Sequence, residues 1–200
     1  MIDLIEINID DFDVFLDIRY ATKNNLCNHS LYSKPFCYLH KNAAANLQKA
    51  IKIAQNHNLK LKIWDCYRPL AVQQYMFDFF SYRDDVANFI SDPKNGFKTH
   101  CRGIAIDLTL TDKNGVELDM ATDFDEFSKR SFHGCNSIST AAQKNRILLL
   151  NIMTQAGFNF IPNEWWHYQM FDPLDYAIIK ADDYMLSDKV RISNSNNLIL

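Results

Sequence analysis

Two stretches of the sequence decide the fold and its site: THCRGIAID at residues 99–107 and EWWHY at residues 164–168. On one uninterrupted strand, His100 and Asp107 would lie roughly 23 Å apart, so the backbone must turn between them if they share a ligand. Gly103 is the natural turning point, because glycine adopts left-handed backbone conformations at little cost. Beyond it, large apolar residues alternate with small or polar ones. This alternation predicts a strand with one face in the core and the carboxylate on the other.

The second stretch places Glu164 three residues before His167. Residues three apart point to opposite faces of a regular strand, so a bulge or one helical turn is needed if both are to face one cavity. Asn163, which follows Pro162, is a candidate start for such a turn. The aromatic residues that come next instead favour a buried strand. The sequence leaves both alternatives open.

The two stretches together supply the ligands of a metal site. His100, Asp107 and His167 offer two imidazoles and one carboxylate, which is typical of a catalytic zinc that keeps its fourth position for water. The pKa of that water falls to about 7, and Glu164 is then available to manage its proton. We therefore predict one zinc ion per chain, although mixed nitrogen and oxygen ligands also accept other divalent ions.

A single histidine beside apolar residues is more often a hydrogen-bonded core residue than a metal ligand, so the combination carries the prediction. The other histidines are not part of a motif that combines metal ligands in this way. We expect His29, His40 and His57 to be surface or structural residues, and the role of His133 stays open.

Composition limits the other classes of protein. The chain has 200 residues, of which 48% are hydrophobic and 13% aromatic, enough for one sizeable core in a single domain. The net charge of −3 and the pI near 6.0 give no footprint for nucleic acid. The five cysteines are widely spaced and form no Cys-x-x-Cys pair, so we expect reduced thiols.

The pattern of elements predicts an α+β fold, in which a mainly antiparallel sheet is flanked by helices and carries the metal site. Helical periodicity appears over residues 43–57, from 70 to about 80, and over 139–156, where Ser139 caps the start and Gly157 the end. Residues 60–66 alternate as a strand does. Arg68 therefore lies at a strand-to-helix corner, next to Pro69.

The first residues are acidic where a secretory signal would be basic, and no apolar run approaches the ~20 residues of a spanning helix. We expect a cytoplasmic protein with no membrane contact. A periplasmic protein that had already lost its signal would look the same.

Both stretches resemble the zinc D-alanyl-D-alanine dipeptidases of the VanX type, which are relatives of the D,D-carboxypeptidases. The resemblance extends to Tyr20-Ala21-Thr22, to Trp64-Asp65-Cys66-Tyr67-Arg68-Pro69 and to Phe124-Asp125. It covers the chain from about residue 15 to 171, and residues 171–200 match poorly.

The resemblance implies a role for each of these residues. His100, Asp107 and His167 would hold zinc, Glu164 would be the general base and acid, and Arg68 would stabilise the oxyanion of the tetrahedral intermediate. An arginine suits this role because its planar, permanently charged fork donates to oxyanions. The alternative for Arg68 is a structural salt bridge with Asp65.

The resemblance also implies that Asp125 receives the ammonium group of a short substrate and that Tyr20 lines that pocket. Asp123 and Glu126 are the alternatives for Asp125. One position departs from the family pattern: Lys98 stands where the family usually has a serine, while Thr99 keeps a hydroxyl next to it. A lysine there offers a cation to a substrate carboxylate, so the dipeptide preference stays open.

The sequence thus predicts a zinc-dependent dipeptidase that hydrolyses D-Ala-D-Ala or a related D,D-dipeptide. One alternative is a D,D-carboxypeptidase or a stem-peptide endopeptidase of the cell wall on the same fold. The alternative from another class is a metal-binding interaction module without turnover. A small dipeptide is the expected partner, and the sequence does not specify an oligomeric state.

Overall fold

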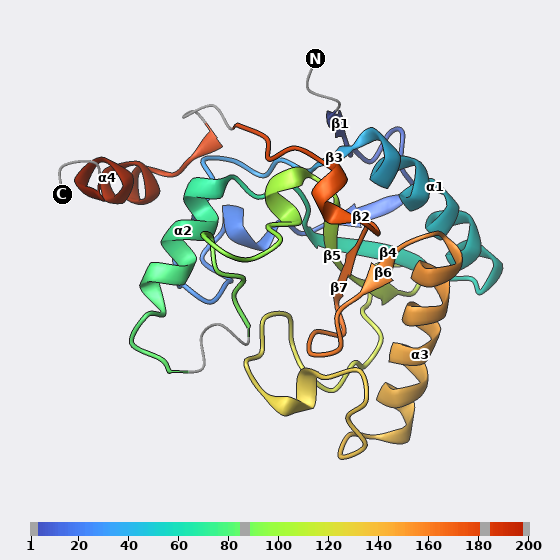
Figure 1. The fold of residues 1–200 in the computed structure, drawn as a ribbon. Helices are drawn as coiled ribbons and strands as arrows, with labels where there is room; N and C mark the ends of the chain where they lie inside the picture. Colours follow the sequence, from blue (N-terminus) through green and yellow to red (C-terminus); the bar gives the residue numbers. More distant parts are fainter. Residues whose placement is uncertain (1–3, 85–88, 181–184, 198–200) are drawn as a thin grey trace.

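The computed structural model describes residues 4–84, 89–180 and 185–197, and shows a sheet with helices on its flanks (Figure 1). Five strands form the main sheet in the order β2-β4-β5-β7-β6, and all neighbours are antiparallel except β2 and β4. The strands are β2 (Val14–Leu16), β4 (Lys60–Asp65), β5 (Ala105–Thr111), β6 (Asn159–Phe160) and β7 (His167–Gln169). A separate antiparallel pair joins β1 (Leu4–Glu6) to β3 (Tyr38–His40). The predicted α+β class and mainly antiparallel sheet are confirmed.

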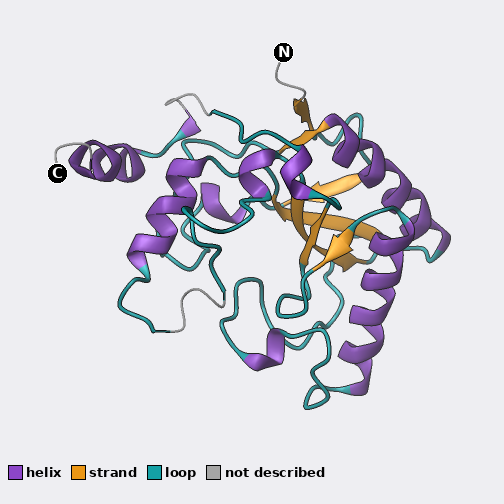
Figure 2. Cartoon of the chain, viewed as in Figure 1, coloured by secondary structure: helices purple, strands orange, loops and turns teal. Residues whose placement is uncertain are grey.

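The described helices are α1 (Lys41–Asn56), α2 (Leu70–Phe79), α3 (Thr140–Gln155) and α4 (Asp188–Asn197). Figure 2 shows α1 and α3 together on one flank of the strands, with α2 and α4 on the opposite side of the molecule. Ser139 caps α3 by accepting a hydrogen bond from the Ala142 amide at 3.1 Å, as predicted. Helix α1 begins two residues earlier than predicted, because the His40 ring caps it by accepting from the Asn42 amide at 3.2 Å.

Strand β5 lies at the centre of the main sheet and is buried along its whole length. The prediction that one of its faces lies in the core therefore describes only half of its surroundings, since residues on both faces are buried. Trp64 packs at 5.1 Å from Phe124 and at 5.8 Å from Trp165 between ring centroids. These three rings form an aromatic cluster beside the centre of the sheet.

Strand β4 ends at Asp65, one residue earlier than predicted, and a bulge interrupts its pairing between Ile63 and Asp65. The bulge brings Asp65 opposite Asp107 on β5. Three residues later Arg68 precedes Pro69, which caps the start of α2. Arg68 therefore lies at the predicted strand-to-helix corner, beside the centre of the sheet. Within the described ranges, no helix is long and apolar enough to cross a membrane.

Candidate metal centre and active site

The backbone turns sharply between the first two predicted ligands. A single 3-10 turn spans His100–Arg102 and ends at Gly103, whose φ of 67° lies in the left-handed region. A β-carbon on Gly103 would come within 2.8 Å of the Leu4 side chain and 3.2 Å of the His40 amide. The predicted role of glycine here is confirmed for two reasons, the backbone conformation and the close approach of other residues.

The second motif forms a turn rather than a continuous strand. The His167 amide donates to the Glu164 carbonyl at 3.4 Å, and β7 begins only at His167. Of the two alternatives, the turn is correct. Trp165 and Trp166 are buried as the aromatic pattern indicates, but they pack within the turn before the strand begins. The turn lets Glu164 and His167 face the same cavity.

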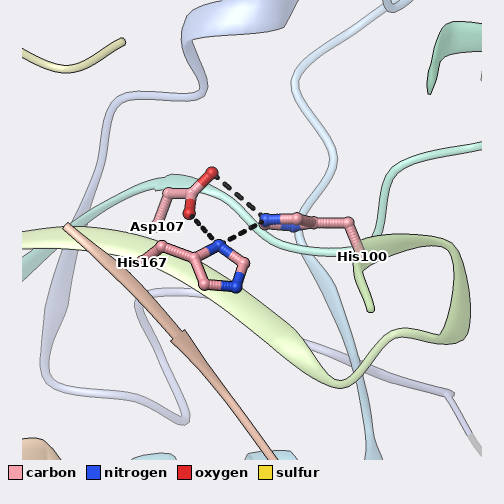
Figure 3. A group of neighbouring side chains, drawn as sticks. All are labelled: His100, Asp107 and His167. Atoms are coloured by element: carbon pink, nitrogen blue, oxygen red, sulfur yellow. Dashed lines mark hydrogen bonds and ion pairs between the residues drawn. The ribbon is translucent and has the colours of Figure 1, made fainter. Parts of the chain in front are cut away.

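The three predicted ligands meet at the centre of the sheet (Figure 3). One ligand atom from each of His100, Asp107 and His167 lies within 4.8 Å of the others, and all three side chains are buried. His100 Nε2 is 3.2 Å from His167 Nδ1 and 3.3 Å from Asp107 Oδ2, while His167 Nδ1 is 3.0 Å from Asp107 Oδ1. Asp107 and His167 are direct register partners across β5 and β7. This His-Asp-His group is a metal site by its donors and its spacing.

The charge of the cluster favours an ionised Asp107. Burial acts to raise the pKa of Asp107, but the charge and hydrogen bonds of His100 and His167 lower it well below its usual range overall. Burial likewise acts to lower the pKa of His167, and the hydrogen bond and charge of Asp107 raise it overall. An ionised carboxylate between two imidazoles is the state that binds a divalent cation.

Arg68 contacts both Asp107 of the metal cluster and Asp65, its ion-pair partner at the end of β4. Its guanidinium donates to the Asp65 carboxylate at 2.8 and 2.9 Å, to Gln73 Oε1 at 3.0 Å and to Asp107 Oδ2 at 3.4 Å. The Arg68 guanidinium carbon also lies 4.9 Å from the centroid of the Tyr20 ring. The salt bridge with Asp65 that we considered as an alternative is present, and it holds the guanidinium at the edge of the cluster.

Two further carboxyl groups, of Glu164 and Asp125, line the cavity beside the cluster and are largely shielded from solvent. Burial, together with the charge of Asp107 and against the lowering charges of His167 and Arg68, raises the pKa of Glu164 to about 7. Burial and the charge of Asp107 raise the pKa of Asp125 well above its usual range, although the Tyr20 hydroxyl donates to Asp125 Oδ2 at 2.7 Å. Asp125 adopts a left-handed φ of 61°. A buried carboxylate of this kind favours a cationic partner.

A cavity of about 470 Å³ joins these groups, and every site residue predicted from the sequence lines it. These residues are Tyr20, Arg68, Thr99, His100, Asp107, Asp125, Glu164 and His167. The alternatives to Asp125 point elsewhere: Asp123 lies 3.8 Å from the Arg19 guanidinium, and Glu126 accepts from the Ser128 hydroxyl at 2.6 Å. Lys98 also lines the cavity, and its ammonium donates to the Lys94 carbonyl at 3.2 Å.

Gln73 and Gln169 also line this cavity, although no motif in the sequence marks them. Gln73, in the first turn of α2, binds the Arg68 guanidinium, and Gln169 Oε1 lies 3.0 Å from His167 Nε2. Strand periodicity is the signal for Gln169, because residues two apart on a strand share a face. For Gln73 the signal is weaker, since it lies five positions after Arg68 in the sequence, on the other side of the strand-to-helix corner.

The remaining histidines lie outside the cluster. His29 Nδ1 is 2.6 Å from the Cys27 carbonyl, His40 caps α1 and His57 ends it. His133 packs against Phe160 at 5.0 Å between ring centroids, and burial lowers the pKa of His133 to about 4. His133 is thus a neutral structural residue. All five cysteines are free, as predicted.

The fold and site together define a metal-dependent hydrolase, and sequence comparison identifies its family. Residues 3–186 match the model of peptidase family M15, D-Ala-D-Ala dipeptidase, so the chain belongs to that family. It is 39% identical over 172 residues to a D-alanyl-D-alanine dipeptidase of Escherichia coli K12, covering 86% of each chain. It is 31% identical over 172 residues to one from Enterococcus faecium, covering 78% of this chain and 85% of the relative.

A solved structure of the LD-carboxypeptidase LdcB shows a similar fold. The TM-score is 0.50 at 16% sequence identity, and the match covers 98% of this chain and 73% of that chain. At this identity the likeness concerns the fold alone.

Proposed function

We propose that the chain is a zinc-dependent dipeptidase that hydrolyses D-Ala-D-Ala or a closely related D,D-dipeptide. The observation that supports this most directly is the convergence of the His100, Asp107 and His167 cluster with Glu164 and Arg68 in one cavity. The relatives described above carry the same activity in their names. In this proposal, residues 1–200 form one metallopeptidase domain that acts in the cytoplasm.

The donor set fits zinc. Two imidazole nitrogens and a carboxylate oxygen are ligands that zinc takes in hydrolytic sites, and three protein ligands leave a position for water. Each imidazole also has its other nitrogen hydrogen-bonded, His100 to the Cys66 carbonyl at 2.6 Å and His167 to Gln169. Such outer contacts orient metal ligands. A zinc ion held here would act as a Lewis acid and would promote ionisation of water at neutral pH.

Glu164 and Arg68, beside the cluster, are assigned proton transfer and stabilisation of the oxyanion. Glu164, whose carboxylate lies 4.0 Å from His167 Nδ1, takes a proton from the attacking water and passes it to the leaving amine. A pKa near 7 suits both halves of this transfer. Arg68 donates to the oxygen that becomes negative when the peptide carbonyl is attacked. Its hydrogen bonds to Asp65 and Gln73 fix the guanidinium before the substrate binds. A donor fixed in this way stabilises the developing negative charge without having to reorient during the reaction.

The substrate's amino terminus is assigned to Asp125. A free ammonium group would pair with this buried carboxylate, and Tyr20 holds the carboxylate in place through its hydroxyl. Thr99 is 8% exposed and presents its side chain to the same cavity. A longer peptide, with no charged amino group at this position, could not form this ion pair, and Asp125 would stay protonated because burial raises its pKa. The loss of this ion pair favours short substrates.

A metal-dependent assay with a panel of peptides tests the proposal. The purified chain, loaded with zinc, is incubated with D-Ala-D-Ala, with L-Ala-L-Ala and with a stem pentapeptide that ends in D-Ala-D-Ala. We expect rapid release of D-alanine from D-Ala-D-Ala and slow or no cleavage of the other two. Preferred cleavage of the pentapeptide would identify a D,D-carboxypeptidase instead. Zinc binding without cleavage of any peptide would indicate an interaction module.

A further inference from the structure

The two histidines of the cluster present different ring nitrogens to its centre. His100 Nε2 lies 3.3 Å from Asp107 Oδ2, whereas the nitrogen of His167 that lies 3.0 Å from Asp107 Oδ1 is Nδ1. The two nitrogens that face each other across the cluster, His100 Nε2 and His167 Nδ1, are 3.2 Å apart. A metal at this point therefore needs the Nδ1–H tautomer of His100 and the Nε2–H tautomer of His167.

Different groups accept the hydrogen bonds that select these tautomers. His100 Nδ1 is 2.6 Å from the backbone carbonyl of Cys66, which no substitution of a side chain removes. His167 Nε2 is 3.0 Å from the side-chain oxygen of Gln169. The tautomer of His167 is therefore set by an amide that could rotate or be replaced.

The sheet fixes Gln169 next to His167. Both residues belong to β7 and, two positions apart, they project from the same face. The backbone of Gln169 is paired on both sides, to Ala105 of β5 and to Asn159 of β6. Its side chain also lines the cavity.

We propose that Gln169 is a positioning residue for the metal site, an assignment that rests on the metal ligands of the proposed function. Its amide oxygen accepts the Nε2–H of His167 and so turns the lone pair of Nδ1 toward the metal. If the amide rotated by 180°, its NH₂ group would face the Nε2–H, and two donors would oppose each other. This arrangement is disfavoured whenever Nδ1 is bound to a metal.

The neutral amide also suits the charges nearby. Asp107, Asp125 and Glu164 already bring three carboxyl groups into the cavity. A glutamate at position 169 would strengthen the hydrogen bond to His167 and increase the basicity of the ring, at the cost of a fourth carboxyl group in the cavity. Glutamine orients the ring without adding that group. Metal affinity and turnover should therefore respond differently when Gln169 is replaced by leucine and when it is replaced by glutamate.

Zinc affinity, measured by competition with a chromophoric chelator, tests the assignment. We expect Gln169→Leu to weaken zinc binding by about 10- to 100-fold, and Gln169→Glu to bind zinc at least as tightly as the unmodified chain. Gln48→Leu, in α1, where Gln48 donates to the Asp11 carbonyl away from the cavity, is the matched control and should leave affinity unchanged. Thermal unfolding of the metal-free variants shows whether the fold is intact.

A second measurement reads the tautomer directly. In the zinc-loaded chain, ¹⁵N–¹H correlations of the imidazole rings should show the Nε2–H form for His167. Unchanged zinc affinity in Gln169→Leu, or equal losses in Gln169→Leu and Gln169→Glu, would overturn the assignment. His167→Ala separates this from an error in the metal site, because wild-type zinc affinity in that variant would refute the ligand set itself. If zinc binds as expected but no D,D-dipeptide is cleaved, the proposed function fails and the role of Gln169 stands.

Discussion

Replacing Arg68 tests whether its guanidinium serves catalysis or only the fold. Arg68 and Asp65 are 7% and 1% exposed, and their shortest contact is 2.8 Å. Removing one member of a buried ion pair costs about 3–5 kcal/mol, because the other charge stays buried without a partner. For a chain of this length each kcal/mol lowers Tm by about 2–4 °C, so Arg68→Met is expected to lose roughly 6–20 °C.

The catalytic loss should be of similar size but separable. Removing one donor from a site that stabilises an oxyanion typically lowers kcat by about 10²- to 10³-fold, equivalent to about 2.7–4 kcal/mol. In the double variant Arg68→Met with Asp65→Asn, the unpaired charge is gone, and the Tyr32 hydroxyl that donates to Asp65 at 2.6 Å can still donate to the amide oxygen. We expect this double variant to recover most of the lost stability but none of the lost kcat.

The assay combines thermal unfolding, zinc content and steady-state hydrolysis of D-Ala-D-Ala well below the lowest Tm. Asp65→Asn alone serves as the control for the partner residue. If kcat returned together with stability in the double variant, Arg68 would be a structural residue only. A change confined to KM would instead move it to a role in substrate binding.

Further predictions concern the acid, the base and the substrate anchors. Glu164→Ala should still bind about one zinc per chain but lose hydrolysis, and near-normal turnover would eliminate Glu164 as the base. Because burial raises the pKa of Glu164 to about 7 and a bound cation lowers it again, kcat/KM of the zinc-loaded chain should fall as pH drops through a midpoint below 7; a midpoint above 7.5 would contradict this. If Lys98 binds the substrate carboxylate, amidating D-Ala-D-Ala at its carboxyl end should raise KM for the unmodified chain but not for Lys98→Met, and equal effects in both would exclude the contact. His133 should destabilise the fold in acid, since its pKa falls from about 6.5 in the unfolded chain to about 4 in the folded one: stability is intact above pH 6.5 and declines by up to about 3 kcal/mol toward pH 4. His133→Phe should flatten that decline in urea titrations at pH 7 and pH 4.5, and an unchanged slope would contradict the assignment.

Local sequence signals predicted the parts of the fold that depend on few residues. Gly103 marks the turn between the first two ligands, and α3 lies between the capping residues Ser139 and Gly157. Both signals are local, because helix capping and a positive φ depend on the residue itself and its neighbours. The ligand set was predictable for a related reason. The residues that flank His100 and His167 in the sequence identify these two histidines as metal ligands, and the fold brings the two motifs together.

Other features depend on contacts that no local pattern encodes. The sequence around Glu164 does not distinguish a strand from a turn, because the buried apolar surfaces of Trp165 and Trp166 suit either conformation. The bulge at the end of β4 follows from the pairing of β4 with β5, far away in sequence. The tautomers of the two ligand histidines likewise follow from tertiary hydrogen bonds.

The pairing of Asp107 with His167 across adjacent strands has a consequence for folding. Side chains on a strand alternate between faces, so a slip of one residue between β5 and β7 would send one of these groups to the far side of the sheet. Only the native alignment can then capture the cation. A metal that binds the native state alone stabilises that state by an amount that grows with the logarithm of the free metal concentration. The ion would thus selectively stabilise the native register of β5 and β7, independently of any bound peptide.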